Sequence, residues 1–151
     1  ITSLFRKISV QTVMQSYPLP PPHHHPPMRI QRSRKKGSKL APSIYVGRGS
    51  KWGNPFRLIG DMIYVDAIHR RKTLSRWVCY YPNGGYTTED VVFLFHDLLM
   101  DLNSHEVEPE IRKRFRYMRD HINDLQGHDL SCWCKKDAPC HADVLLELSN
   151  V

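Results

Sequence analysis

The sequence predicts a small single α/β domain, with helices packed on a sheet of three to five strands in a two-layer or Rossmann-like three-layer arrangement. Three observations favour this class. Short β-branched and aromatic runs follow residue 28, amphipathic segments of helical length occupy residues 66–126, and a strand followed by a helix closes the sequence. A chain of 151 residues is long enough to bury one hydrophobic core.

The first elements are strands. Met28–Arg32 alternates polar and apolar residues, and Ile44–Gly47 is a β-branched and aromatic run that ends at a glycine. A basic loop separates these two segments. Phe56–Val65 is typical of a hairpin that turns at Gly60-Asp61.

Three helices are expected next. Asp66 can cap the first, which would run to about Tyr81 with Cys79 packed against the core. Thr88 can cap the second, and Pro109 suits the first turn of the third, which Gly127 would end. A strand over Leu130–Cys134 and a last helix that opens on Cys140 and His141 complete the domain.

Residues 1–27 are predicted to be a disordered extension outside the domain, because Tyr17–Pro27 contains six prolines and three adjacent histidines. The domain itself would span residues 28–151. Residues 1–60 carry 11 of the 22 Lys and Arg residues and no Asp or Glu, so the net charge of +7 originates in this part. Such a positive field attracts phosphates or nucleic acid.

The cysteines and the hydropathy pattern bear on location. Three of the four cysteines lie within residues 132–140, which differs from the spread pattern of a disulfide framework. No apolar run is long enough to span a bilayer, and no signal peptide is recognisable. We therefore expect a cytoplasmic protein without a membrane partner.

A first candidate site follows the strand that ends at Gly47. Ligands in open α/β sheets gather beyond the carboxyl ends of strands, and glycines let backbone N–H groups approach a phosphate. Arg48 and Lys51 add positive charge, Trp52 offers a flat face for a base, and Asn54 offers a donor and an acceptor. The candidate ligand-binding residues of this loop are Gly47, Arg48, Gly49, Ser50, Lys51, Trp52, Gly53 and Asn54.

A second candidate site lies at the start of the last helix, where free N–H groups and the helix dipole favour an anion or a thiolate. Cys140 is a candidate nucleophile and His141 a candidate acid or base, with Asn54 from the first loop as a third candidate catalytic residue. Cys132 and Cys134 are interpreted as small buried hydrophobic residues. Zinc bound by these three cysteines and His141 ranks last, because a pair one residue apart and an adjacent Cys-His pair differ from the usual zinc spacing.

The segments Tyr45–Phe56, Leu130–Cys134 and Pro139–Leu145 together resemble an uncharacterised family of phages and bacteria, domain of unknown function 4326. The resemblance covers about Met28 to Asn150. It implies a compact α/β domain in which both segments matter, and it implies no particular reaction.

The leading hypothesis is a pocket, formed by both segments, that binds a nucleotide-like or phosphorylated ligand, with processing of that ligand as an open extension. This hypothesis includes neither a metal nor a resident cofactor, and it leaves open whether the protein is an enzyme. A non-catalytic nucleic-acid-binding protein is the alternative, with Tyr45 and Trp52 as exposed aromatics, and a structural zinc domain is the second alternative. The oligomeric state is not predicted.

Overall fold

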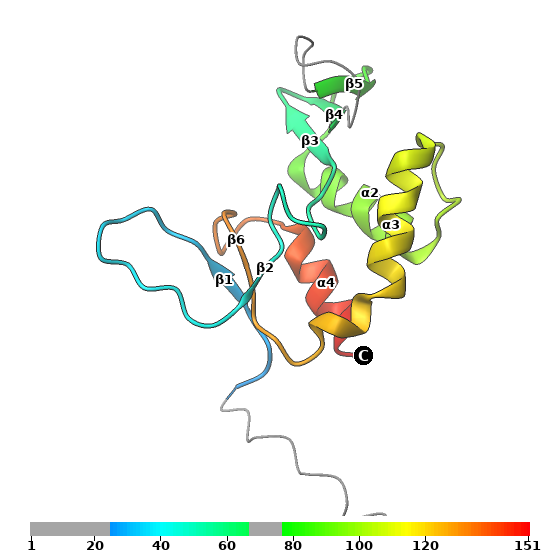
Figure 1. Cartoon of the computed structure of the whole chain (residues 1–151). Helices are drawn as coiled ribbons and strands as arrows, with labels where there is room; N and C mark the ends of the chain where they lie inside the picture. Colours follow the sequence, from blue (N-terminus) through cyan, green and yellow to red (C-terminus); the bar gives the residue numbers. More distant parts are fainter. Residues whose placement is uncertain (1–24, 67–76) are drawn as a thin grey trace, which may run out of the picture.

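The computed structural model describes residues 25–66 and 77–151 (Figure 1). These ranges contain six strands, three α-helices and one 3-10 helix. The predicted α/β class is confirmed, but the strands form two three-stranded sheets and not one. The predicted N-terminal extension lies outside the described residues apart from positions 25–27.

The first sheet is parallel and contains β1 (Arg29–Gln31), β2 (Ile44–Tyr45) and β6 (Leu130–Cys132). The strand order is β1-β6-β2, so β6 is central and pairs with both neighbours. All three residues of β6 are buried, as expected for a strand covered on both faces. Because the strands are parallel, the segments that leave β2 and β6 emerge at the same edge of the sheet.

The second sheet is antiparallel and contains β3 (Phe56–Ile59), β4 (Met62–Asp66) and β5 (Trp77–Tyr81), in that order. The predicted hairpin is confirmed, and Gly60 in its turn has a φ of 64°, which favours glycine. Figure 1 shows this sheet at the end of the molecule away from the parallel sheet.

The predicted helix from Asp66 to Tyr81 is wrong at both of its described ends. Asp66 is the last residue of β4 and pairs with Trp77, the first residue of β5; residues 67–76 lie outside the described part. The run Trp77–Tyr81 is rich in aromatic and β-branched side chains, and pairing with β4 overrides its apparent helical spacing. Cys79 therefore lies on a strand, and it is exposed rather than packed in the core.

The helices are α2 (Thr88–Met100), α3 (Pro109–Asp120) and α4 (His141–Ser149), with the 3-10 helix η1 (Ile122–Leu125) between α3 and β6. Pro109 stands in the first turn of α3, as predicted. The cap of α2 is Thr87, one residue before the predicted position, because Thr87 and Asp90 form a reciprocal capping box. None of these helices has the length and apolarity that a bilayer crossing requires.

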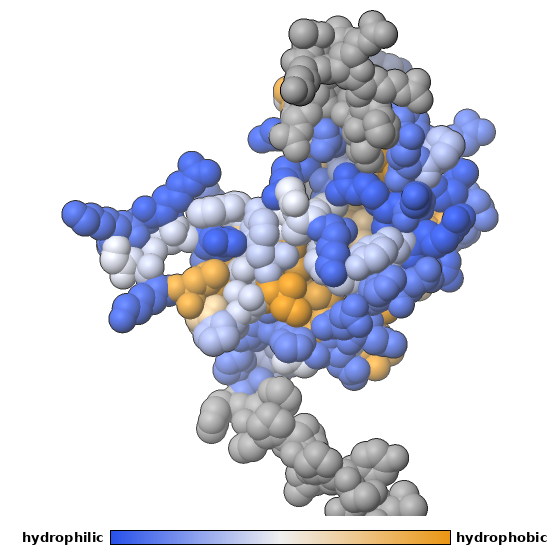
Figure 2. Space-filling view, in the orientation of Figure 1, coloured by the Kyte–Doolittle hydropathy of each residue, from blue (hydrophilic) through white to orange (hydrophobic). Residues whose placement is uncertain are grey.

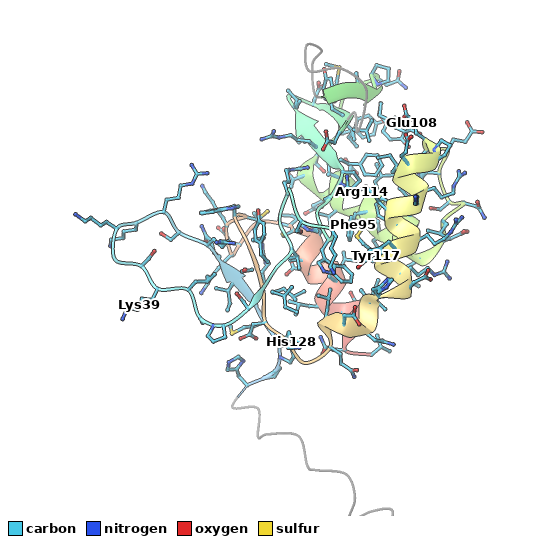
Figure 3. The ribbon with its side chains drawn as sticks, in the orientation of Figure 1. Lys39, Phe95, Glu108, Arg114, Tyr117 and His128 are labelled. Atoms are coloured by element: carbon cyan, nitrogen blue, oxygen red, sulfur yellow. The ribbon has the colours of Figure 1, made fainter. Side chains whose placement is uncertain are left out.

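The core lies between the three helices and both sheets, and Phe56 of β3 belongs to it. The rings of Phe95 and Phe115 are fully buried, with centroids 5.3 Å apart, and they join α2 to α3. Figure 3 shows Phe95 on the inner side of the helices. Ala142 and Leu145 of α4 are fully buried in the same core, which fixes the start of α4 against the sheet.

Candidate functional site

The loop after β2 and the segment after β6 enclose a cavity of about 380 Å³. Gly47, Arg48 and Asn54 line it from the first loop, and residues 132–134 and 139–141 line it from the second segment. Thr88, Val91 and Val92 of α2 contribute another wall, and Arg34 and Arg57 complete the lining. The two candidate sites from the sequence therefore meet in one cavity of a size that suits a small ligand.

The structure divides the ten predicted ligand-binding residues into two groups. Five of them line the cavity: Gly47, Arg48, Asn54, Cys140 and His141. The other five do not: Gly49, Ser50, Lys51, Trp52 and Gly53. The second group belongs to the loop that carries Gly47, Arg48 and Asn54, and it contributes to the packing of that loop.

Trp52 is buried and is not the stacking surface that the sequence suggested. Only 2% of the residue is exposed, and its ring lies beside Tyr117 of α3, with centroids 6.4 Å apart. The aromatic residue that does line the cavity is Trp133, which is 43% exposed. The guanidinium groups of Arg32 and Arg34 lie 5.3 Å and 5.0 Å from the centre of its ring.

The loop after β2 is held by its own polar groups. Arg48 donates to the carbonyls of Asn54 at 2.6 Å and Phe56 at 2.8 Å, and Asn54 Oδ1 accepts from the Phe56 N–H at 2.9 Å. Gly53 packs so closely that an added Cβ would lie 2.9 Å from the Gly47 carbonyl oxygen. These contacts give Arg48 and Asn54 a role in shaping the cavity wall.

Arg114 of α3 supports the same loop from behind by donating to the Gly53 carbonyl at 3.0 Å (Figure 3). Burial lowers the pKa of Arg114, and a Coulombic contribution from Asp66 partly opposes this shift. The loop is therefore held between the parallel sheet and α3, which positions its cavity-lining residues.

Among the residues that the structure describes, Arg34, Arg48 and Arg57 line the cavity, and no Asp or Glu does. Burial lowers the pKa of Arg48, and the neighbouring charge of Arg57 lowers it further, while Cys134 and Asp66 act in the opposite direction. Arg34 and Arg57 were not singled out from the sequence. Arg34 could have been identified from its place in the acid-free basic loop, which follows β1 of the parallel sheet.

His141 connects the two segments. It is 6% exposed, and its Nε2 lies 2.6 Å from the Val46 carbonyl oxygen. A carbonyl only accepts hydrogen bonds, so Nε2 carries the proton and Nδ1, which lies 3.7 Å from Cys140 Sγ, is free to accept one. Burial lowers the pKa of His141 and so favours the neutral ring, although the hydrogen bond to Val46 acts in the opposite direction.

Three cysteine sulfurs gather at the cavity. The Sγ atoms of Cys132, Cys134 and Cys140 all lie within 4.8 Å of one another, and those of Cys132 and Cys140 are 3.4 Å apart. Cys132 is buried, as predicted, but Cys134 is exposed. The reason is that β6 ends at Cys132, so Cys134 leaves the strand direction and turns towards Cys140.

The thiols share their hydrogen bonds unequally. Hydrogen bonds from the thiols of Cys134 and Cys140 lower the pKa of Cys132, with a further contribution from Arg29. The hydrogen bond to Cys132 raises the pKa of Cys140, and burial adds to that rise. The donors around Cys132 therefore favour the thiolate form at that position.

Arg29 of β1 holds the segment between Cys134 and Cys140 in place. It donates to the carbonyls of Lys135, Lys136 and Ala138 at 3.2, 2.7 and 2.9 Å. Its Nε also pairs with Asp143 in the first turn of α4 at 3.0 Å. No signal in the sequence distinguished this arginine from the others near the N-terminus.

The family model for a domain of unknown function (DUF4326) matches residues 30–151. The chain belongs to the DUF4326 family. Both cavity-forming segments and Arg34, Arg48 and Arg57 lie inside the matched region. Among curated proteins and among solved structures, no match to the chain was found.

Proposed function

We propose that this DUF4326 domain binds a nucleotide-like phosphorylated ligand in the cavity between the two segments. The observation that carries the proposal is the lining of that cavity, which, within residues 25–66 and 77–151, combines three arginines and one exposed indole with no carboxylate. Guanidinium groups bind phosphate oxygens through paired N–H donors, and an aromatic face stacks on a base.

The backbone adds to the positive character of the cavity. Thr88 and His141, the first residues of α2 and α4, both line it. The N-terminus of a helix carries a partial positive charge and free N–H groups, which stabilise a nearby anion. The cap of α4 is Cys140, whose side chain makes no capping hydrogen bond, so the first turn of this helix keeps donors for a ligand.

Trp133 supplies the proposed recognition of the base. Its ring is exposed at the cavity, next to Arg34, so a base on the ring would place its phosphate near guanidinium groups. This assignment replaces Trp52, whose ring is buried. The proposal predicts that a nucleotide binds more tightly than inorganic phosphate or the matching nucleoside.

The test is a thermal-shift and calorimetric screen of nucleoside mono- and diphosphates, with the nucleosides and inorganic phosphate as comparisons. Arg34→Gln should weaken nucleotide binding by about tenfold or more, since hydrogen bonds to charged groups contribute about 1.5–3 kcal/mol. Lys39→Gln is the matched control, because Lys39 belongs to the same basic loop but lies away from the cavity (Figure 3).

Two results would end this proposal. One is that no nucleotide raises the melting temperature of the purified chain. The other is that Arg34→Gln and Lys39→Gln bind a nucleotide equally well, because the charge of the loop as a whole would then explain the affinity.

Nucleic-acid binding is a second candidate, and the basic loop favours it. Residues 32–43 extend away from the body of the domain (Figure 1), and their outer end is hydrophilic (Figure 2). Arg34, Lys35, Lys36 and Lys39 are exposed on it, and the loop carries no acidic residue. A flexible polyanion could contact these side chains while one nucleotide enters the cavity.

This second function is tested by measuring oligonucleotide affinity against salt concentration. Five loop cations, the four above and Arg32, would together contribute a slope of log K against log salt of about −3.5 on single-stranded nucleic acid. The double variant Lys35→Gln/Lys36→Gln should make that slope shallower by about 1.4. An oligonucleotide that fails to bind at low salt, or a slope that the double variant leaves unchanged, would contradict it.

A further inference from the structure

The cluster of Cys132, Cys134 and Cys140 is a candidate metal site. Its three sulfurs lie within 4.8 Å of one another, although the residues come from the end of β6, the bend after it and the cap of α4. Tetrahedral zinc with Zn–S bonds of about 2.3 Å separates its sulfur ligands by about 3.8 Å. The observed 3.4 Å between Cys132 and Cys140 differs from that value by only a few tenths of an ångström.

His141 is not a fourth ligand of this group. Its Nε2 is hydrogen-bonded to the Val46 carbonyl oxygen. Its Nδ1 lies 3.7 Å from Cys140 Sγ but is not among the ligand atoms that lie within 4.8 Å of one another. All three cysteines line the cavity. A metal held by three sulfurs would therefore have its fourth coordination position directed at the ligand pocket, an arrangement typical of catalytic zinc sites.

We propose that Cys132, Cys134 and Cys140 bind one zinc ion as three thiolates, with the fourth position open to the cavity for water or an oxygen of the bound ligand. Each thiol releases one proton when the ion binds, so the site carries a net charge of −1. The nearby guanidinium groups of Arg29 and Arg48 offset this charge, since both interact electrostatically with Cys140.

The surrounding structure organises the three ligands before a metal arrives. The hydrogen bonds of Arg29 to three carbonyls close the segment from Lys135 to Ala138, which brings Cys134 back towards Cys140. The Arg32 N–H also donates to the Cys132 carbonyl at 2.8 Å, which fixes the end of β6. Supporting contacts of this kind orient metal ligands in proteins.

The experiment measures metal in the full chain purified without an added affinity tag. The expected result is about one zinc per chain by elemental analysis, with loss of most of it in Cys134→Ser. Cys134 is the informative position, because it is exposed in a bend and its substitution should leave the fold intact. Cys79→Ser is the matched control, since Cys79 is also an exposed cysteine but lies on β5.

The adjacent histidines His23, His24 and His25 could bind zinc by themselves, so the cobalt-substituted protein provides the second measurement. Cobalt bound by thiolates shows sulfur-to-metal charge-transfer absorption, which histidine ligands do not produce. This absorption should be present in the Cys79→Ser protein and absent from Cys134→Ser. Azide should change the visible spectrum if the fourth position is open.

The proposal is overturned if the chain holds no zinc after purification with zinc present, or if Cys134→Ser retains both the metal and the thiolate absorption. A disulfide between Cys132 and Cys140, found by mass spectrometry in freshly purified protein in place of metal, would also overturn it. None of these measurements involves a nucleotide. Failure of the metal site and failure of the ligand pocket can therefore be told apart.

Discussion

The two tryptophans of the candidate site should respond to substitution in opposite ways. Trp52 is 2% exposed and fills the space between its loop and α3, whereas Trp133 is 43% exposed at the cavity. Replacing a buried Trp by Ala costs about 3–5 kcal/mol, because contacts are lost and a cavity remains. For a domain of this length that loss lowers the melting temperature by about 6–20 °C.

Trp133→Ala should be far milder for stability. The substitution removes two exposed cation–π contacts, with Arg32 and Arg34, which contribute about 0.5–1 kcal/mol each. Its main effect should be on ligand binding, since stacking of a base on an aromatic ring contributes about 1–3 kcal/mol. We therefore expect about fivefold or greater loss of nucleotide affinity with only a small change in melting temperature.

The assay is urea unfolding followed by circular dichroism for both variants, together with nucleotide titration of Trp133→Ala. Trp52→Phe keeps an aromatic ring in the core and should lose less stability than Trp52→Ala. Such a difference would identify the space left by the removed indole as the cause of the loss. A loss below about 1 kcal/mol for Trp52→Ala, or a larger loss for Trp133→Ala than for Trp52→Ala, would contradict the assignment of Trp52 to the core.

Three further predictions concern the frame of the site. Gly53→Ala should destabilise the chain by about 1–3 kcal/mol in chemical unfolding, because its Cβ would press on the Gly47 carbonyl oxygen at 2.9 Å; equal stability would mean that the loop adjusts freely. Thr87→Ala should lose about 1 kcal/mol through the capping box, whereas Thr88→Ala, one residue later, should lose less; equal losses would contradict the assigned cap. Arg29→Met should lower the free energy of unfolding by at least about 2 kcal/mol, since three carbonyls lose a charged donor, and it should speed hydrogen exchange near residues 135–138. Unchanged exchange there would contradict the role of Arg29 in holding this segment.

Most of the fold follows from local patterns in the sequence. The strand at residue 29, the hairpin that turns at Gly60, Pro109 in the first turn of α3 and the helix that starts at His141 were all predicted, because each has a local physical cause. Trp77–Tyr81 failed because its apolar residues fit either a helix or a strand, and the decision depends on pairing with β4.

The site was less predictable, since burial and chain direction are tertiary properties. Trp52 and Trp133 both come shortly after a strand of the parallel sheet, and only the position of α3 determines that Trp52 is covered. Zinc ranked last because a pair one residue apart on an extended strand and an adjacent Cys-His pair both differ from the usual zinc spacing. Once β6 ends at Cys132, the same spacing brings three sulfurs together.

The convergence of the two segments has its cause in the order of the parallel sheet. β2 and β6 are 85 positions apart when counted from Tyr45 to Leu130, yet they are hydrogen-bonded neighbours. Because the two strands are parallel neighbours, the segments that follow them leave the sheet at the same edge. The loop with Arg48 and the segment that begins after Cys132 therefore lie next to each other there. β1, on the other side of β6, adds Arg29, which holds the sulfur-bearing segment closed. One central strand thus brings together the positive wall of the cavity, the three thiols and the clamp that positions them, and this explains why motifs so distant in sequence can form one site.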